Sequence, residues 1–433
     1  MKSRFITIIT LILLLMLSAC NEKDLRMNGT DMPYVYKEQK YTPAPESFVP
    51  FYINFVCRHG SRYPIESKYI DELIEVLSDA EKKSMITLTG SQLKTSLEHI
   101  INKFNNKWGL LSHVGVAEIQ GIASRMIKNY IHVFDEAIYV QSDSAERCVK
   151  TMDAFIDVFK NKKDSIKINT EIVKKDNVVL NFFDVNLEYL KFKKHGTWKN
   201  IYNSYSDSIL GNTRLLYKFF LPEYVSTINK APQFLHALFK INAILPNTDE
   251  KISLKDFFTG EEEYLLWNTQ NVKEYMEKGP WPGEYGLQTD ISFPLLEDFL
   301  ITSYNSIVDG GVSADFRFAH AETIIPFAAF LDINIASAKT MDINNVSNVW
   351  KDFEIAPMAA NIMWIFYSNN DGEIIVKMLL NEKEVSFPVN SNITPYAHWE
   401  DIQKYYQNKL DALSVIPSLS TEAKLKYFKE YKK

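Results

Sequence analysis

Hydrophobic and polar positions predict strands and helices in turn over the first part of the chain. Apolar runs rich in β-branched and aromatic residues predict strands at 51–56 and 137–141. Other segments repeat their apolar residues at helical spacing, and these predicted helices span residues 67–77, 90–104, 115–133 and 146–159. Strands that alternate with helices in this way are typical of a sheet covered by helices.

The middle of the chain follows a different pattern. Residues 170–290 carry Leu, Phe, Tyr and Lys at helical spacing, and a Gly-Pro-Trp-Pro-Gly run at 279–283 interrupts them near the end. We therefore expect a mainly helical cap domain at 169–290, inserted into an α/β core made of residues 49–168 and 291–433. In the second part of that core, the predicted elements are a helix at 295–309, strands at 314–319 and 385–389, a helix from Thr323, a hairpin at 361–367 and 373–380, and a peripheral helix at 413–433.

The N-terminus has the pattern of a targeting segment. Lys2 and Arg4 precede an apolar stretch at 5–17, which is too short to span a bilayer comfortably. Leu-Ser-Ala-Cys at 17–20 resembles a bacterial lipoprotein cleavage site, which implies a signal peptide at 1–19 and lipidation of Cys20. We expect an exported protein, periplasmic or anchored to the outer membrane through Cys20, with 20–48 as a tether; ordinary secretion with cleavage nearby is the alternative.

Charge narrows the classes of partner. Of the 48 Lys and Arg residues, two lie in the signal segment, so 46 remain against 54 Asp and Glu. This acidic balance argues against nucleic acid as a partner, but a locally basic cleft can still attract an anion. Lys191, Lys193 and Lys194, with His195 and Lys199 nearby, are candidate outer cationic contacts. A solvated helix face explains this cluster equally well.

The chemistry is concentrated in the run Arg-His-Gly-Ser-Arg-Tyr-Pro at 58–64, directly after the first predicted strand. Arg58 and Arg62 supply planar, permanently charged groups that match phosphate oxygens. His59 lies between them as a candidate nucleophile, and Gly60 lets the backbone turn and approach a ligand closely. The run is suited to covalent capture of a phosphoryl group, whereas a surface loop with an incidental histidine is the alternative.

Two further segments fit the same chemistry. His-Ala-Glu at 320–322 follows one predicted strand, and Arg147 follows another. Run 58–64 is the signature of histidine acid phosphatases, and His-Ala-Glu resembles their multiple inositol polyphosphate phosphatase branch, which attacks phytate. The Phe-Phe-Asp run at 182–184 also resembles this branch, although Asn181 and Asn186 stand where an arginine and a cysteine are expected. The resemblance, to a bacterial member, spans roughly residues 48–412.

This resemblance implies a fold and a mechanism. The expected fold is α/β, with a phosphoglycerate-mutase-like mixed sheet flanked by helices and the inserted helical cap domain. His59 is the implied nucleophile and Glu322 the proton donor, while the substrate phosphate is held by Arg58, Arg62, Arg147 and His320. The implied substrates are phytate and lower inositol polyphosphates. If residues 320–322 were helical, His320 and Glu322 would point apart and their joint role would weaken.

Some alternatives stay open. A broader histidine acid phosphatase for sugar phosphates is one, and a non-catalytic surface lipoprotein that binds carbohydrate on its aromatic residues is another. No cofactor or metal is expected, since the other histidines show no ligand spacing; only His113 is placed near the site. Cys57 and Cys148 could pair, but we favour two buried thiols.

Overall fold

The computed structural model describes residues 25–162, 166–211, 214–228 and 231–413. The predicted signal peptide, Cys20 and all but the first residue of the predicted C-terminal helix lie outside these ranges, so they stay predictions. Among the described helices, none is both long and apolar enough to cross a membrane.

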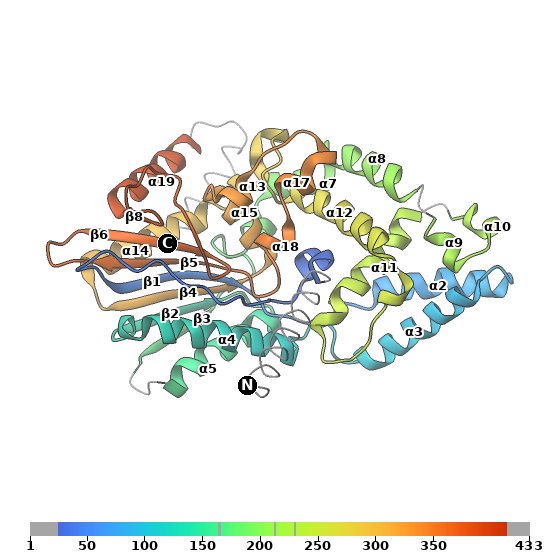
Figure 1. Ribbon diagram of the computed structural model, residues 1–433, viewed down its shortest axis with the longest axis horizontal. Helices are drawn as coiled ribbons and strands as arrows, with labels where there is room; N and C mark the ends of the chain where they lie inside the picture. The colour runs from blue at the N-terminus through green and yellow to red at the C-terminus, as the bar shows by residue number, and fades with distance from the viewer. Residues whose placement is uncertain (1–24, 163–165, 212–213, 229–230, 414–433) are drawn as a thin grey trace, which may run out of the picture.

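A mixed sheet of eight strands forms the centre of the described structure (Figure 1). Its order is β3-β2-β4-β1-β5-β6-β7, and β8 pairs with β6 at the side. The first four strands in this order run parallel, whereas β5 to β8 pair antiparallel with their neighbours. The strands are β1 Val49–Arg58, β2 Ala137–Ser142, β3 Ile168–Ile172, β4 Val312–Ala319, β5 Asn361–Ser368, β6 Ile374–Leu380, β7 Lys383–Val385 and β8 Tyr396–His398.

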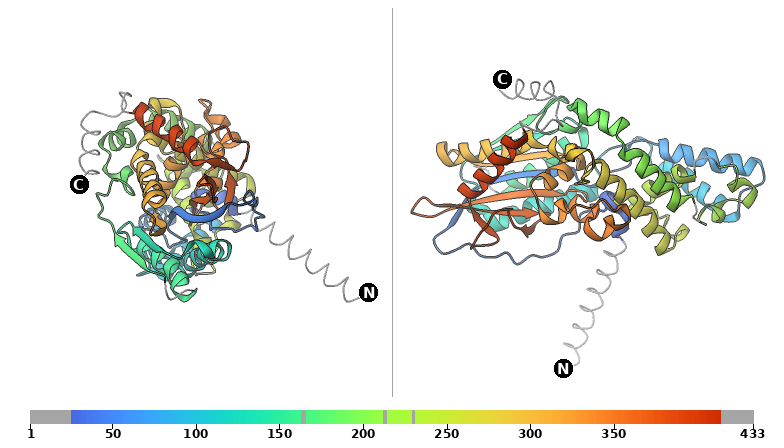
Figure 2. Two further views of the ribbon diagram at one scale, coloured as in Figure 1. Left: turned by 90° about the vertical axis from the view of Figure 1, so that its left-hand side faces the viewer. Right: turned by 90° about the horizontal axis from the view of Figure 1, so that it is seen from above.

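Helices cover both faces of this sheet (Figures 1 and 2). On one face, α4 (His113–Tyr130) and α5 (Glu146–Lys162) pack against β1, β2 and β4. On the other, α14 (Phe293–Asp309), α15 (Ala321–Phe330) and α19 (Trp399–Leu413) pack against β1, β5 and β6. Strand β1 is therefore buried on both faces along most of its length, which explains its nearly continuous apolar sequence.

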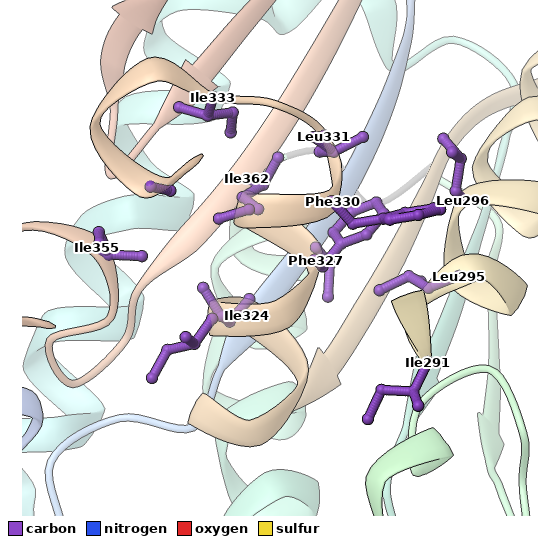
Figure 3. Packing of buried hydrophobic residues seen from close by; sticks show 14 of the residues in the cluster. Ile291, Leu295, Leu296, Ile324, Phe327, Phe330, Leu331, Ile333, Ile355 and Ile362 are labelled. Atoms are coloured by element: carbon purple, nitrogen blue, oxygen red, sulfur yellow. The ribbon is translucent and has the colours of Figure 1, made fainter. Parts of the chain in front are cut away.

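Helix α15 is fixed by apolar packing around most of its surface. Figure 3 shows Ile324 and Phe327 of α15 among side chains from α14, β5 and the segment before α14. Every residue of α15 except Glu322 is buried. A close-packed helix of this kind holds its first turn in one position. That turn carries Glu322.

A second, mainly helical part projects from one edge of the sheet (Figure 1). The helices near 67–77 and 90–104 were expected to cover the sheet, but this expectation is wrong. These helices, α2 (Lys68–Lys82) and α3 (Leu88–Phe104), share an apolar core with α9 (Leu216–Phe219) and α11 (Ala231–Ile244). Helical periodicity shows that one face is buried, and it does not show which partner buries it.

Further helices complete this part and link it to the sheet. They are α6 Phe182–Val185, α7 Leu187–His195, α8 Trp198–Leu210, α10 Pro222–Val225, α12 Gly260–Glu277, α13 Leu287–Asp290, α16 Asn334–Ser337, α17 Val346–Val349 and α18 Asp352–Ile355. The short 3₁₀ segments are η1 Arg26–Asp31, η2 Ile131–Val133, η3 Leu245–Asn247, η4 Lys255–Phe257, η5 Gly283–Gly286 and η6 Ile343–Asn345.

Three boundaries differ from the sequence-based expectations. Segment 20–48 is not a free tether throughout, because residues 28–32 are buried against the body of the protein. Strand β3 reaches Ile172, so the sheet continues past the expected start of the cap at residue 169. Strand β7 occupies Lys383–Val385, and the strand expected at 385–389 does not form.

Candidate active site

The register of the parallel strands brings three polar residues to one edge of the sheet. Arg58 at the end of β1 pairs with Ala319 at the end of β4, and β2 ends beside β4 at Ser142. The next residues along the chain are His59, His320 and Asp143. Backbone hydrogen bonds extend the pairing, since the His59 N–H donates to the Ala319 carbonyl over 2.9 Å. Carboxyl ends of parallel strands are the usual place for a ligand site in such sheets.

The loop after β1 is held against the first turn of α4. A Cβ on Gly60 would lie 2.7 Å from the Gly115 carbonyl oxygen, and one on Gly115 would lie 2.2 Å from the Ser61 carbonyl oxygen. Gly60 was expected to let a ligand approach the backbone closely. Instead, the space that a side chain at this position would need is filled by the backbone of α4. Glu118 of α4 also accepts a hydrogen bond from the Ser61 N–H over 2.8 Å. These contacts fix the backbone that presents His59.

A cavity of about 730 Å³ opens between this edge of the sheet and the helical part. The motif residues form its floor, and α7, α8, α11 and α12 contribute charged and aromatic side chains to its opposite wall. All six residues of the predicted reaction centre line it, namely Arg58, His59, Arg62, Arg147, His320 and Glu322. The structure thus brings together residues that are separated by more than 250 positions in sequence.

The surroundings of His59 favour a neutral ring with one free lone pair. Its Nδ1 lies 3.0 Å from the Gly60 carbonyl oxygen, which can only accept a hydrogen bond. Nδ1 therefore carries the proton, and Nε2 keeps a free lone pair. Burial first, and then the surrounding arginines, lower the pKa of His59 well below its ordinary value. The lone pair thus stays available across the physiological pH range.

The three arginines keep some hydrogen-bond donors for which the described residues supply no partner. Arg58 is oriented by the carbonyl oxygens of Thr30 and Ala356, to which its Nη1 donates. The buried Nε atoms of Arg58, Arg62 and Arg147 have no hydrogen-bond partner among the described residues. All three arginines line one cavity, and their positive charges suit an anion as its ligand.

His320 is held by a carboxylate. Its Nε2 lies 2.9 Å from Asp143, which also accepts from the Asn181 side-chain amide over 2.7 Å. Burial alone would lower the pKa of His320, but Cys148 and the hydrogen-bonded Asp143 outweigh burial and raise it to about 10. Asn181 stands where the resemblance led us to expect an arginine, and it supports Asp143 rather than facing the ligand.

Glu322 is the second residue of α15, so the segment is helical from residue 321. His320 precedes the helix in an extended conformation, with φ −125° and ψ 171°, and both side chains line the cavity. His320 and Glu322 therefore face the same cavity, although a fully helical segment would have pointed them apart. Burial would raise the pKa of Glu322, but Lys278, 3.0 Å away, and His320 outweigh it and hold the pKa well below its usual range.

These features coincide with a family match over most of the chain. A model of the histidine phosphatase superfamily (branch 2) matches residues 52–381. The chain belongs to this superfamily. The match confirms the expected family, and it includes both the 58–64 run and the His-Ala-Glu segment. A sequence search of curated proteins finds no match.

Two solved structures of other proteins share the fold. A Bifidobacterium longum multiple inositol polyphosphate phosphatase, solved with inositol hexasulfate, has a TM-score of 0.76 at 20% identity, over 88% of this chain and 97% of that one. The phytase from D. castellii has a TM-score of 0.70 at 16% identity, over 89% of this chain and 85% of that one. At these identities the likeness confirms the expected α/β architecture of this histidine phosphatase.

The cationic wall of the histidine phosphatase cavity differs from the expected one. Lys193 lines the cavity, as expected, 3.7 Å from Glu277. Lys191 is exposed and pairs with Glu188, and Lys194 is exposed outside the cavity lining, so the expectation is wrong for both. Lys199, which was named beside these candidates, also lines the cavity. Three further lysines of the wall were not expected from the sequence, and they are Lys240, Lys273 and Lys278. Helix periodicity carries no signal for a side chain that faces a cavity rather than solvent.

Two further expectations concern His113 and the cysteines. The side chain of His113 is 94% exposed, pairs with Asp249 and does not line the cavity, so its placement near the site is wrong. Cys57 and Cys148 are both free and buried, which confirms the preference for thiols over a disulfide.

A metal would have to use residues already engaged beside the cavity. Donor atoms of Asp143, Cys148 and His320 lie within 4.8 Å of one another. However, Arg147 Nη2 is 3.3 Å from His320 Nδ1, and its positive charge opposes a cation there. The arrangement favours an anion.

Proposed function

We propose that this histidine phosphatase hydrolyses the phosphomonoesters of phytate and lower inositol polyphosphates through a phosphohistidine on His59. The observation that carries the proposal is the neutral Nε2 of His59 beside three arginines, at the floor of a cavity whose opposite wall carries five lysines. A cavity with cations on both sides suits a ligand that bears several phosphates, whereas a small monoester needs only the floor. The fold shared with a phosphatase solved with inositol hexasulfate supports this substrate class.

In the first step, His59 Nε2 attacks the phosphorus in line, and the bond between phosphorus and the inositol oxygen breaks. Arg58, Arg62 and Arg147 hold the three non-bridging oxygens as charge redistributes over them. Protonated His320 adds a fourth positive charge beside them. Glu322 gives its proton to the departing oxygen, because an alkoxide is a poor leaving group.

In the second step, water attacks the phosphohistidine. Glu322, now a carboxylate, takes a proton from this water as the P–N bond breaks. Inorganic phosphate leaves, and His59 returns to its neutral form with the proton still on Nδ1. General acid–base help of this kind is typically worth about 10²–10⁴-fold in rate.

The test compares the wild-type protein with a His59→Ala variant. We expect the wild type to release phosphate from phytate faster than from glucose phosphate, and His59→Ala to release none from either. A phosphohistidine trapped by rapid quenching in the wild type would support the covalent step. Activity on small esters alone would contradict the substrate class, and full activity of His59→Ala would contradict the mechanism.

A further inference from the structure

Lys278 joins the helical part to the proposed proton donor. It directly follows α12, is only 8% exposed, and lies between two carboxylates. Its Nζ is 3.0 Å from Glu322 Oε1 and 2.7 Å from Glu274 Oε2. The side chain also lines the cavity, so a bound ligand can reach the same ammonium group. Glu322 and a substrate phosphate therefore compete for one cation.

The resting state of this pair conflicts with the reaction. To protonate a departing alkoxide, Glu322 must carry a proton, yet its pairing with Lys278 keeps it ionised. Other charged or titratable groups influence Glu322 or Lys278 from several sides, namely Glu274 and Glu277 of α12, Asp184 of α6, Tyr189 of α7, His320, Arg58 and Arg62. Something must weaken the Lys278 pair when substrate binds.

We propose that Lys278 couples proton donation by Glu322 to the presence of a second substrate phosphate, and so selects polyphosphorylated substrates. This inference rests on the proposed function. A phosphate next to the one under attack draws the Lys278 ammonium away from Glu322. Glu322 is then left beside an anion without its counter-ion, takes a proton from solvent, and passes it to the leaving oxygen. A monophosphate has no second group, so the pair persists and Glu322 stays ionised.

The other lysines of the wall lack this arrangement. Lys273 and Lys193 lie 4.0 Å and 3.7 Å from Glu277, and Lys240 lies 3.7 Å from Asp31. Each pairs with a carboxylate that takes no part in the reaction. They can hold substrate phosphates, but among the lysines of the described cavity wall Lys278 alone contacts Glu322.

The test uses Lys278→Met and three substrates: phytate, glycerol phosphate and p-nitrophenyl phosphate. Phytate and glycerol phosphate have alkoxide leaving groups, but only phytate has neighbouring phosphates. The nitrophenolate group leaves without a proton, so the initial release of nitrophenol from p-nitrophenyl phosphate reports the fold and the attack by His59 without proton donation by Glu322. Lys273→Met is the matched control, since it removes a charge from the same cavity wall without touching Glu322.

We expect Lys278→Met to lower the ratio of kcat for phytate to kcat for glycerol phosphate about 10-fold or more, within the range of general acid catalysis. The ratio changes mainly because kcat for glycerol phosphate rises. The pH above which this kcat falls should also increase, because Glu322 keeps its proton up to a higher pH. Lys278→Arg keeps the wild-type ratio. Lys273→Met raises KM for phytate without moving that pH limit.

An equal loss of kcat with phytate and glycerol phosphate would overturn the inference, because it would make Lys278 a simple phosphate ligand. If Lys278→Met does not fold, Glu274→Gln provides the second test. Without the Glu274 carboxylate, Lys278 pairs with Glu322 alone and holds it ionised more strongly. We then expect kcat for glycerol phosphate to fall, and the pH above which it declines to decrease. If that pH does not change, the inference is overturned. Failure of the wild type on phytate would instead contradict the proposed function itself.

Discussion

At the scale of single residues, the site gives two neighbouring histidines opposite protonation states. The rings of His59 and His320 are 5.6 Å apart, centroid to centroid. Burial and the arginines keep His59 neutral, whereas Asp143 helps to keep His320 protonated despite its burial. Environments that drive the pKa values of two adjacent groups apart define their roles in a reaction. Here one ring supplies a lone pair and the other a positive charge.

This division predicts the effect of Asp143→Asn. Without the carboxylate, one of the two groups that raise the pKa of His320 is lost, so this pKa falls from about 10 and the charge is lost at lower pH. We expect the alkaline limit of kcat/KM for p-nitrophenyl phosphate to move to lower pH by more than about one unit, which corresponds to roughly 1.4 kcal/mol. Asp153→Asn, on the exposed side of α5, is the control. An unchanged pH profile in Asp143→Asn would contradict this role.

How far sequence could predict the site depends on where each residue lies. Arg58, His59 and Glu322 were predictable because they belong to compact motifs next to strand ends. Asp143 also follows a strand, so its position was a usable signal, although its partnership with His320 requires the sheet register. Nothing in the local sequence marks Lys278 as a site residue. It reaches the cavity because α12 lines it, and the position of α12 depends on packing between segments far apart in sequence.

At the scale of elements, the contact between the loop after β1 and helix α4 is close enough to exclude any side chain. Both Gly60 and Gly115 are needed for it, and neither is required by a positive φ angle. Ser112 strengthens the contact, since its side chain donates to the Ser61 carbonyl while accepting from the Gly115 N–H. The cap of α4 and the catalytic loop are thus one unit.

We therefore expect Gly115→Ala to be destabilising. Alanine is favoured over glycine in a helix by about 1 kcal/mol. The new Cβ would meet the Ser61 carbonyl oxygen at 2.2 Å, and relief requires movement of the loop, at a cost near the upper end of the roughly 1–3 kcal/mol typical of overpacking. The net loss should lower Tm and kcat together.

Gly260→Ala is the matched control for that substitution, measured by thermal unfolding and phosphate release. Gly260 begins α12, and a Cβ there would meet nothing within 4 Å. We expect its Tm to equal or exceed that of the wild type. A Gly115→Ala protein with wild-type Tm and kcat would show that the loop yields more easily than the contact implies.

The sequence predicted most elements of the sheet but not their full arrangement. Strands β1, β2, β4, β5 and β6 were all expected within one to two residues of their observed ends. Strand β7 was expected two residues too late, and β3 and β8 were not predicted. Strands of three to five residues give little periodicity to detect. Helices α2 and α3 belong to the helical part because of long-range packing. An amphipathic pattern shows that one face of a helix is buried, but it does not show which segment packs against that face.

At the scale of the whole molecule, several buried carboxyl groups favour an acidic environment. Burial raises the pKa of Glu118, Glu297 and Asp352 to about 7, and that of Asp290 to about 6. Each is protonated in the folded state at a pH where the unfolded chain has already lost the proton. Their contribution to stability is present at low pH and is lost as pH rises through these folded values.

Stability should therefore be greater at pH 5 than at pH 8. Two buried neutral histidines, His59 and His236, oppose this trend below their ordinary pKa, but the four carboxyl groups outnumber them. Groups with lowered pKa, such as Glu274 at about 2, favour folding until the pH falls well below 5. We expect a maximum of Tm near pH 5, and Glu297→Gln should reduce the difference between pH 5 and pH 8. A higher Tm at pH 8 would contradict this balance.

Two different parts of the fold, the strand ends and the inserted helices, form the cavity. The reacting groups follow the ends of sheet strands, whereas the lysines opposite them come from helices inserted into the α/β framework. Insertions tolerate replacement far better than the strands that carry them. Substitutions in the helical wall can therefore reshape the entrance to the cavity while the residues at the strand ends keep their positions.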